Sequence, residues 1–383
     1  MATSGATIER IDAWYVRVPL ATPIVLGSLH IVHRDFVVVR ARTRDGVDGA
    51  AYSLTRGSPL DQVLIDSVAP HLLGRDALAT SARLDDMQRG VITLGPVGLV
   101  GRAISLLEIC LWDIKGKVAG LPVHRLLGGS RDAAPMLAVA PYAANDEADD
   151  AYAERLIPLA QRGYQALKLY PMARPEAMTR RLAAIRRAVG DEIGLVIDMA
   201  WSFRTAPEAI AAVRQWEDFG LTWVEDPFPS WEPVLMRQLT EGVRTPIAAG
   251  DEVSVPAVME TLIRDRAVDV VRLDATSIGG YARFGELAAT ARRAGYQVSH
   301  HAYAEIQQHC VFAWPGVSPV EIFMPGSPTW GTSRFLTEEL DLPAGERELP
   351  APTRPGVGIP FDWAAVEALA SRHAAADATE GGR

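Results

Sequence analysis

The sequence contains very little cysteine. Its 383 residues include only Cys110 and Cys310, which stand far apart in segments of helical character. A framework of disulfide bonds is therefore excluded, and a reducing cytoplasm is the expected location. No apolar run approaches the roughly 20 residues that cross a bilayer. The first residues also lack the basic start and apolar stretch of a signal peptide, so we expect a cytoplasmic protein with no membrane partner.

Positive charge is also scarce. The chain has 38 Lys and Arg residues against 47 Asp and Glu residues, which gives a formal net charge of -9. Because no long basic run occurs either, nucleic acid is not an expected partner. The apolar content of 48% and the charged content of 22% are ordinary for a soluble globular protein. The length suits two domains, or one barrel with an appendage.

Several motifs of common enzyme classes are absent. The sequence has neither a Walker A loop nor a GxSxG elbow. A dinucleotide-binding GxGxxG is also missing after the first strand of the alternating region described below. Glu305 and His309, four residues apart in EIQQH, resemble half of a helical zinc motif, but HExxH is absent. We interpret them as a pair on one helix face.

The first third of the chain reads as strands followed by helices. Residues 11–20 and 35–53 alternate like antiparallel strands, and RDGVDG supplies the turn between two of them. Residues 60–118 then show helical periodicity, interrupted by a glycine-rich break. Residues 355–370 predict a turn and a helix that return to this α+β module. The small and polar residues after them are expected to be frayed.

After residue 129, short β-rich runs alternate with helical segments. Eight such runs occur at a spacing of roughly 25 residues, which is what a strand, a helix and two loops require. They are PMLAVAPY, QALKLY, IGLVIDMA, LTWVED, TPIAAGDE, VDVVRLDA, GYQVSHH and SPVEIF. Eight evenly spaced strands with helices between them predict a (β/α) barrel. A doubly wound open sheet is the alternative architecture.

Carboxylates stand at the ends of three consecutive strands. The third strand ends in Asp198, the fourth in Glu225 and Asp226, and the fifth in Asp251 and Glu252. The chemistry of a barrel lies at the carboxyl ends of its strands. Any one of these acids alone would be an ordinary loop or helix-capping residue. Together they predict a site for a hard divalent cation such as Mg²⁺, which takes oxygen ligands.

The last three strands add further polar groups. Asp274 and His301 end the sixth and seventh strands, so a carboxylate–imidazole pair is expected; the alternative is a structural histidine near the surface. His300 must point away from the side that His301 faces, because strand neighbours alternate. Glu321 lies in the eighth strand, where it is either a site residue or a salt-bridged structural carboxylate.

The second strand ends in Lys168 and Tyr170. Residues two apart in a strand share a face, so the amine and the phenol point to the same side. The ordinary interpretation is a snorkelling lysine beside a barrel tyrosine. In the context of the neighbouring acids, we interpret the pair as part of an active site.

In this order, these residues and the motifs VEDP, AAGDE, DATSIGG and SHH resemble the mandelate racemase subgroup of the enolase superfamily. DIKGKVAGLPVHRLLGG, residues 113–129, is similar to the superfamily's junction between capping domain and barrel. The resemblance implies a (β/α)7β modified TIM barrel with an α+β capping domain. The capping domain would span 1–125, completed by about 350–383, and the barrel would span 126–349.

The resemblance also implies the site. Mg²⁺ would be held by Asp198, Glu225 and Asp251. The implied catalytic residues are Lys168, Tyr170, Asp274, His301 and Glu321. His301, paired with Asp274, would be one acid/base group, and Glu321 would hydrogen-bond the carboxylate of the substrate.

Three positions depart from the family pattern. Tyr170 replaces the second lysine of Lys-x-Lys, which is the usual base on that face. We expect the ammonium of Lys168 and the nearby dication to lower the pKa of the phenol from its usual value near 10. Ala200 replaces an asparagine, so one polar contact to the substrate is expected to be missing. Asp251 stands where the third metal ligand is more usually a glutamate. The adjacent Glu252 could be mistaken for that ligand.

The implied reaction begins with removal of the proton next to the carboxylate of a small-molecule substrate, which forms an enediolate. The preferred prediction is an acid-sugar dehydratase that yields a 2-keto-3-deoxy acid. The alternatives are a racemase or epimerase of an α-hydroxy acid and a catalytically silent metal-binding barrel. We expect a homo-oligomer, from dimer to octamer. A loop over residues 21–35 is expected to cover the site, and its apolar residues 24–29 argue against a highly hydroxylated substrate.

Overall fold

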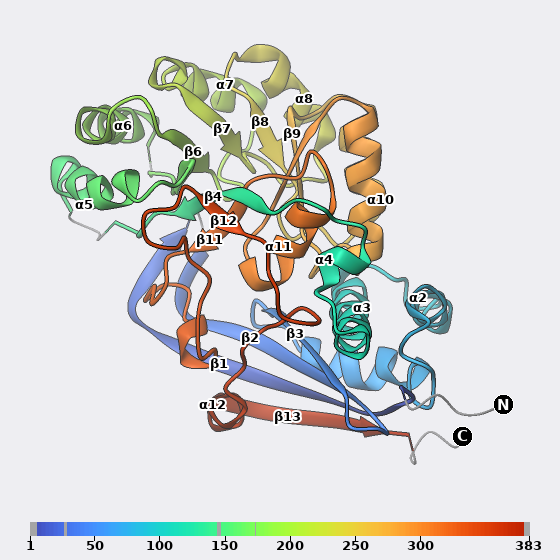
Figure 1. The fold of residues 1–383 in the computed structure, drawn as a ribbon. Coiled ribbons are helices and arrows are strands. Elements are labelled where there is room, and N and C mark those ends of the chain that lie inside the picture. Colours follow the sequence, from blue (N-terminus) through green and yellow to red (C-terminus); the bar gives the residue numbers. More distant parts are fainter. Residues whose placement is uncertain (1–5, 27–28, 144–146, 173, 379–383) are drawn as a thin grey trace.

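The computed structural model describes residues 6–26, 29–143, 147–172 and 174–378. Two sheets organise the chain, as Figure 1 shows: an antiparallel sheet with its own helices, and a parallel barrel surrounded by helices. This arrangement confirms the predicted barrel with an α+β capping domain. Within the described residues, no helix combines the length and the apolar character needed to cross a membrane.

The antiparallel sheet has the strand order β13-β1-β2-β3. Its strands are β1 (Ile8–Leu26), β2 (Leu29–Thr43), β3 (Asp48–Leu54) and β13 (Ala370–Asp377). The β-branched run Val37–Val39 is fully buried in β2, as residues that favour a pleated and covered surface should be. The two alternating runs of the sequence are therefore strands, as predicted.

Two expectations for this sheet were wrong. Residues 21–35 do not form the expected loop, because β1 and β2 continue as a paired hairpin up to the pair Leu26–Leu29; Gly27 and Ser28 lie outside the described residues. The tail after residue 372 is also not frayed as far as Asp377. It forms β13 on the edge of β1, where His373 stacks on Trp14 with ring centroids 4.9 Å apart. Pairing with an open strand edge overrides the weak strand propensity of an alanine-rich tail.

Short and long helices follow the antiparallel sheet. They are α1 (Leu60–Val63), the π-turn η1 (Leu64–Val68), the 3₁₀ turn η2 (Ala69–His71), α2 (Thr80–Gly90), α3 (Gly98–Ala119) and α4 (Val123–Leu126). The long helix α3 packs closely on β3. A Cβ atom at Gly49 would lie only 2.0 Å from the carbonyl oxygen of Cys110, so glycine is required there. Cys110 and Cys310 are both free and buried.

The barrel contains the eight predicted strands in parallel order. They are β4 (Ala133–Val139), β5 (Ala166–Leu169), β6 (Gly194–Asp198), β7 (Leu221–Glu225), β8 (Ile247–Ala249), β9 (Val270–Leu273), β10 (Gln297–His300) and β11 (Val320–Phe323). The sheet runs from β10 through β4 to β11, and a bridge between Val298 and Val317 brings its two ends together. The architecture is therefore a nearly closed barrel and not a doubly wound open sheet.

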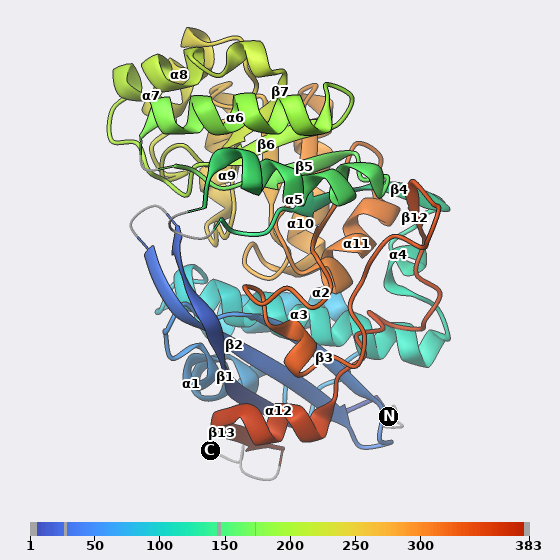
Figure 2. The same ribbon diagram turned by 90° about the vertical axis from the view of Figure 1, so that its left-hand side faces the viewer.

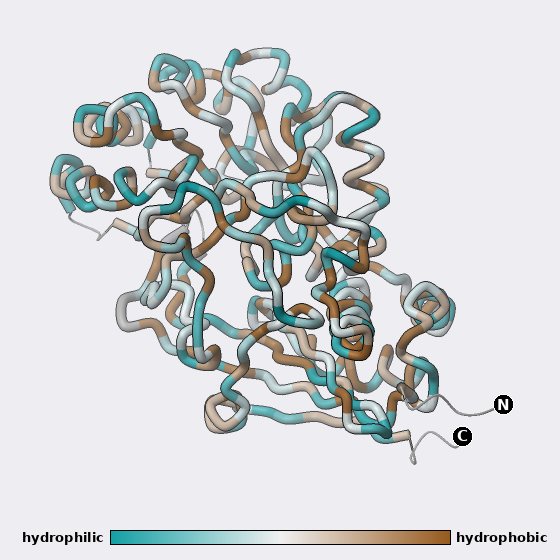
Figure 3. The backbone as a smooth tube through the Cα atoms, viewed as in Figure 1, coloured by the Kyte–Doolittle hydropathy of each residue, from teal (hydrophilic) through white to brown (hydrophobic). Residues whose placement is uncertain are grey.

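One helix follows each barrel strand except the last. These helices are α5 (Asp149–Gln161), α6 (Pro175–Val189), α7 (Ala206–Arg214), α8 (Pro233–Gly242), α9 (Pro256–Arg264), α10 (Gly280–Arg293) and α11 (Ala304–Ala313). Figure 3 shows hydrophobic residues along the strands and hydrophilic residues on the outer turns of the helices. The turns η3 (Glu217–Phe219) and η4 (Thr332–Arg334) are short additions.

The chain returns from the barrel to the antiparallel sheet at its end. Strand β12 (Glu348–Pro350) pairs with β4, and α12 (Trp363–Leu369) leads into β13. Figure 2 shows the antiparallel sheet on the side of the barrel opposite to α7 and α8. The exact domain boundary between residues 125 and 126 stays a prediction.

The inside of the barrel places the site. An apolar layer fills it, made of Leu137, Ala166, Val196, Trp223, Ala248 and Val270. Residues two apart in a strand point to the same side, so the residue two positions after each member of this layer also faces the inside of the barrel. There the chain carries Lys168, Asp198, Glu225 and Arg272 instead of apolar side chains. The charged groups therefore form the layer directly above the apolar one, at the carboxyl ends of the strands.

Candidate active site

Three carboxylates from adjacent strands meet at the barrel mouth. Asp198 ends β6, Glu225 ends β7 and Asp251 follows β8, and each offers an oxygen within 4.8 Å of the other two. Glu225 is fully buried, and Asp251 is nearly so. Oxygen ligands in this number suit a hard divalent cation that keeps open positions for water or substrate. Of the five acids at the strand ends, the structure thus brings together the three that the family resemblance implied.

Lys168 points into this group of acids. Its ammonium lies 3.3 Å from Asp198 Oδ2 and 3.5 Å from both Asp251 Oδ2 and Glu321 Oε1, and it contacts Glu225 most closely. A cation is therefore already favoured at this point of the barrel. Burial opposes the charge of Lys168, but Glu225 and the other acids outweigh it and raise the pKa of the amine well above its usual value.

Arg272 is a site residue that the sequence analysis missed. It lies in β9, fully buried, and its Nε donates to Asp251 at 2.8 Å while one Nη donates to Glu321 at 2.8 Å and lies 3.1 Å from Glu225. Four carboxylates, counting Asp198 with these three, share two cations, Lys168 and Arg272.

The surroundings give these carboxyl groups different acidities. Burial raises the pKa of Glu225 to about 8, although Arg272 opposes this. Burial also opposes the charge of Asp251, but Arg272, His301 and Lys168 override it and hold the pKa of Asp251 well below its usual range. The pKa of Glu321 is lowered in the same way: Arg272 and Lys168 outweigh the effect of burial and lower it to about 2. Neutralisation by cations, and not solvent, keeps this buried group charged.

Glu252 turns away from the three acids. It binds Arg56 and, at 2.8 Å, Arg102, which project from the capping part of the chain. Burial opposes the charge of Glu252, but the two arginines outweigh it and hold its pKa far below the usual range. Of these two neighbouring acids, Asp251 belongs to the metal-binding carboxylates, and Glu252 forms ion pairs between the barrel and the capping part.

This difference gives a test of the register. We expect Asp251→Asn to lose divalent-metal binding, and Glu252→Gln to keep it within a few-fold of the unmodified protein. Glu252→Gln should instead lower the melting temperature, because the mostly buried guanidinium of Arg102 and the more exposed one of Arg56 lose their shared partner. Calorimetric titration with Mg²⁺ and thermal unfolding followed by circular dichroism measure the two effects. The opposite pattern of metal binding would show that the wrong acid has been assigned.

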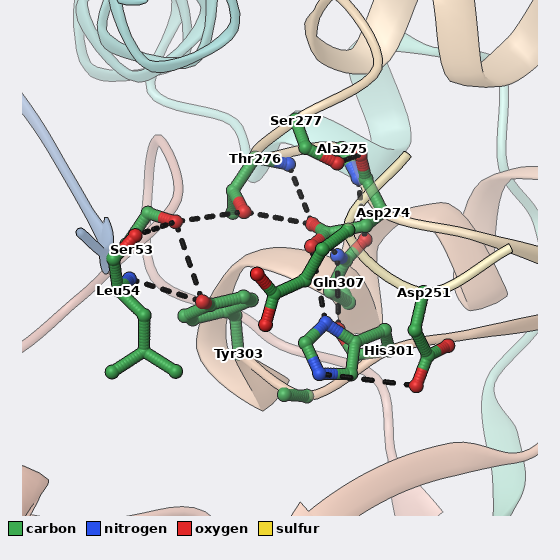
Figure 4. A network of polar contacts seen from close by, with 12 residues as sticks. Ser53, Leu54, Asp251, Asp274, Ala275, Thr276, Ser277, His301, Tyr303 and Gln307 are labelled. Atoms are coloured by element: carbon green, nitrogen blue, oxygen red, sulfur yellow. Dashed lines mark hydrogen bonds and ion pairs between the residues drawn. The ribbon is translucent and has the colours of Figure 1, made fainter. Parts of the chain in front are cut away.

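His301 and Asp274 form the predicted pair. His301 Nδ1 lies 3.1 Å from Asp274 Oδ2, and Nε2 lies 3.9 Å from Asp251 Oδ2. Figure 4 shows the imidazole between the two carboxylates. Burial lowers the pKa of His301, but the carboxylates of Asp251 and Asp274 outweigh burial and raise it to about 9. His300 points elsewhere: its Nε2 accepts from the backbone N–H of Glu321 at 2.9 Å, and burial lowers its pKa to about 3.

Asp274 is held by groups that the sequence analysis did not select. Its Oδ1 accepts from the backbone N–H and the hydroxyl of Thr276 and from Gln307 Nε2, each at 2.8 Å. Thr276 Oγ1 in turn lies 3.2 Å from the hydroxyl of Ser53, at the end of β3. Figure 4 shows this chain of contacts from the capping sheet to the histidine. The antiparallel sheet therefore helps to orient His301.

Tyr170 lies on the other side of the pocket. Its ring stacks on that of Tyr142, with centroids 3.6 Å apart and an angle of 17°. Burial and then Tyr142 raise the pKa of Tyr170 well above its usual value. Lys168 does not lower the pKa of the phenol as expected, because its ammonium turns to the carboxylates. The effect expected from the dication stays a prediction. Tyr170 as a base stays a prediction.

The pocket combines residues from both sheets. Besides the groups above, its lining includes Arg34, Leu54, Ala200, Trp201, Phe323 and Trp330. Ala200 adds no polar side chain, although its backbone N–H donates to Asp198 Oδ1 at 2.9 Å. Arg34 and Trp330 escaped the sequence analysis, because neither lies at the end of a barrel strand.

Glu305 and His309 make separate contacts. Tyr52 donates a hydrogen bond to Glu305 at 2.6 Å, and His309 Nδ1 accepts from the backbone N–H of His124 at 3.2 Å. They share a helix, as interpreted, but each side chain stabilises a different part of the structure.

Comparison with known families agrees with this fold and site. Residues 10–128 match the mandelate racemase / muconate lactonizing enzyme N-terminal domain, and residues 150–365 match the enolase C-terminal domain-like family. The chain therefore belongs to the mandelate racemase and muconate lactonizing enzyme family of the enolase superfamily, as its motifs predicted.

Similar proteins include several enzymes of acid sugars. An L-talarate/galactarate dehydratase of Salmonella typhimurium is 29% identical over 82% of this chain and 81% of its own length. A D-xylonate dehydratase of Haloferax volcanii is 28% identical over 87% and 85%. The crystal structure of an L-talarate dehydratase from a Polaromonas species, complexed with Mg and L-glucarate, has a TM-score of 0.85 and 26% identity, and covers 97% of this chain and 99% of that chain.

Proposed function

We propose that this protein is a Mg²⁺-dependent dehydratase of an acid sugar. The observation that carries the proposal is the placement of three metal-binding carboxylates beside a histidine–aspartate pair in one pocket. Such a pocket suits a substrate whose own carboxylate approaches a cation while the neighbouring carbon faces a proton acceptor. The dehydratases among the relatives support this reaction class.

Asp198, Glu225 and Asp251 would hold the Mg²⁺. The ion, when bound, supplies Lewis acidity that stabilises negative charge on the substrate carboxylate. Glu321 and Lys168 flank the same position and would hydrogen-bond that carboxylate. Preorganised groups of this kind usually contribute more than any other effect to the stabilisation of such an anion.

Proton transfer falls to groups on two sides of the pocket. His301, held in one orientation by Asp274, faces the substrate position from β10. Tyr170 faces it from the end of β5. In a dehydratase, one of these groups removes the α-proton, and the pair of electrons left behind expels the hydroxyl of the β-carbon as water after protonation. The enol that results becomes a 2-keto-3-deoxy acid.

A racemase or epimerase is the second candidate. It is favoured by the same two-sided placement of Tyr170 and His301, because two groups on opposite faces of a carbon can remove and return a proton. Cycloisomerases also occur among the relatives, such as a 3,6-anhydro-alpha-L-galactonate cycloisomerase of Streptomyces coelicolor, 27% identical over 95% of this chain and 99% of its own length.

The experiment that separates the two is a screen of acid sugars and α-hydroxy acids with Mg²⁺. We expect a 2-keto acid, which forms a semicarbazone with strong ultraviolet absorption. A change of optical rotation without a carbonyl product would favour the racemase instead. No reaction with any member of either class would contradict both.

Two narrower expectations also belong to the proposal. The free and buried thiols of Cys110 and Cys310 support a reducing cytoplasm. Trp231, 71% exposed, and Val234, 60% exposed, are large apolar side chains that a second copy of the chain would cover in a homo-oligomer. Light scattering after size-exclusion chromatography gives the number of subunits.

A further inference from the structure

Arg34 is a buried cation that faces the active-site pocket. It projects from β2, is 3% exposed, and lines the same pocket as Lys168 and His301. Its Nε donates to the carbonyl oxygen of Thr329 at 2.9 Å, and Nη2 lies 3.5 Å from the hydroxyl of Tyr142. Among the described residues, no carboxylate lies within 4.0 Å of the guanidinium. Since a buried charge is costly without a partner, an anion is expected here.

The neighbouring acids already have partners of their own. Asp35, next in the chain, binds Arg17 at 2.8 Å. Glu252 binds Arg56 and Arg102. Of the two arginines that line the pocket, Arg34 and Arg56, Arg34 is therefore the one that lacks a carboxylate partner in the described part of the chain. An anionic group of a ligand would supply that partner.

The surroundings fix the guanidinium in place. It lies over the ring of Trp330, 5.8 Å from the centroid, and Trp330 stacks on Phe323 with centroids 4.1 Å apart. Its third nitrogen, Nη1, makes no hydrogen bond to the described residues. Donors that are held before the ligand arrives lose little freedom on binding.

Arg34 and the metal-binding acids belong to different ends of the site. The contacts lead from Arg34 to Tyr142, from Tyr142 to its stacking partner Tyr170, and from there along β5 to Lys168. Arg34 also lines an adjoining cavity of about 230 Å³, together with Leu54. A ligand whose carboxylate lies at the metal-binding acids thus has room to extend towards Arg34.

We infer that Arg34 binds a second anionic group of the substrate, at the end remote from the carboxylate that undergoes chemistry. The substrate is then a dianion, a sugar dicarboxylate or a phosphorylated sugar acid, and not a simple sugar monoacid. A guanidinium recognises both groups, because its planar fork donates to two oxygens. This inference rests on the proposed function and narrows the substrate from acid sugars in general to those with a second anionic group.

The test measures binding without turnover. In the His301→Asn protein with Mg²⁺, calorimetry compares six-carbon sugar diacids, the matching monoacids, and their 6-phosphates. We expect a diacid or a phosphorylated acid to bind at least about 10-fold more tightly than the matching monoacid, as a charge-assisted hydrogen bond allows. The ligand that binds more tightly shows whether the second anionic group is a carboxylate or a phosphate. Adding Arg34→Gln should remove this preference and leave binding of the monoacid unchanged.

Two further variants serve as controls. Arg34→Lys keeps the charge but loses the fork, so its preference should be intermediate. Arg180→Gln removes an exposed arginine of α6 and should change neither affinity. Equal weakening of monoacid and dianion by Arg34→Gln, or no effect on either, would overturn the inference while acid-sugar turnover by the unmodified protein still supported the proposed function. If the unmodified protein turns over no acid sugar and none binds, the proposed function fails, and the inference falls with it.

Discussion

Asp198→Asn, Glu225→Gln and Asp251→Asn are each expected to lower turnover by about 1,000-fold or more. Each change removes one anionic oxygen ligand from the cluster, and the metal ion supplies several kcal/mol of stabilisation to the developing negative charge. The fold should survive, because these side chains lie at the barrel mouth above a separate apolar layer. Asp251→Asn should also lower the melting temperature, because Arg272 loses a charged partner.

Thermal unfolding separates the catalytic effect from a structural one. Mg²⁺ should raise the melting temperature of the unmodified protein, because a ligand that binds only the folded state stabilises it. The same addition should leave the three variants nearly unchanged. Asp218→Asn is a matched control, since this aspartate lies on the surface with its side chain 96% exposed. Full activity after exhaustive chelation would refute the metal site altogether.

His301→Asn and Tyr170→Phe are expected to show which group removes the proton. General acid–base catalysis contributes about 10²- to 10⁴-fold, so the change that removes the base should lower turnover by that factor. Exchange of the α-proton with D₂O, followed by NMR, isolates this step. If two bases act on opposite faces, Tyr170→Phe should retain exchange only for the epimer that presents its proton to His301. If one base acts, one of the two changes should abolish exchange, and the other should slow only the loss of water.

Tyr296 provides a matched control for Tyr170. Tyr296→Phe removes a phenol whose hydroxyl donates to Ile263 and which does not line the pocket, so it should leave exchange unchanged. If both His301→Asn and Tyr170→Phe kept full exchange and turnover, neither residue would be a base. Tyr170 is stacked on Tyr142, and its pKa is raised well above its usual value. The pKa of His301, about 9, lies nearer to neutral pH, so His301 is the stronger candidate for the base.

The strand ends of the barrel were predictable because barrel geometry is regular. Asp198, Glu225 and Asp251 follow short buried runs at even spacing, and parallel strands carry their carboxyl ends to one rim. Arg272 follows the same rule, since it faces inward two residues before Asp274. It was missed because a single arginine in VVRLDA has no local partner. Its role becomes visible only when closure of the barrel brings acids from three other strands within reach.

The residues contributed by the capping part were not predictable from local patterns. Residues 21–35 were expected to cover the site, but no local pattern singles out Arg34 among them. Only the packing of β2 against the barrel mouth places this side chain in the pocket. The support that Ser53 gives to Asp274 through Thr276 likewise crosses between the two sheets. Contacts between distant segments depend on how whole elements dock, which periodicity does not report.

The position of β13 has a consequence for synthesis of the protein. The edge of β1 is paired by residues 370–377, which follow the whole barrel in the chain, while β2 pairs with its other edge. Domains tend to fold as they emerge from the ribosome, amino-terminal part first, but here the amino-terminal sheet must keep one edge open until the barrel and β13 have been made. During that interval the exposed edge of β1 is a site for pairing with other chains. A variant that cannot form β13 would keep that edge exposed, even with every catalytic residue in place.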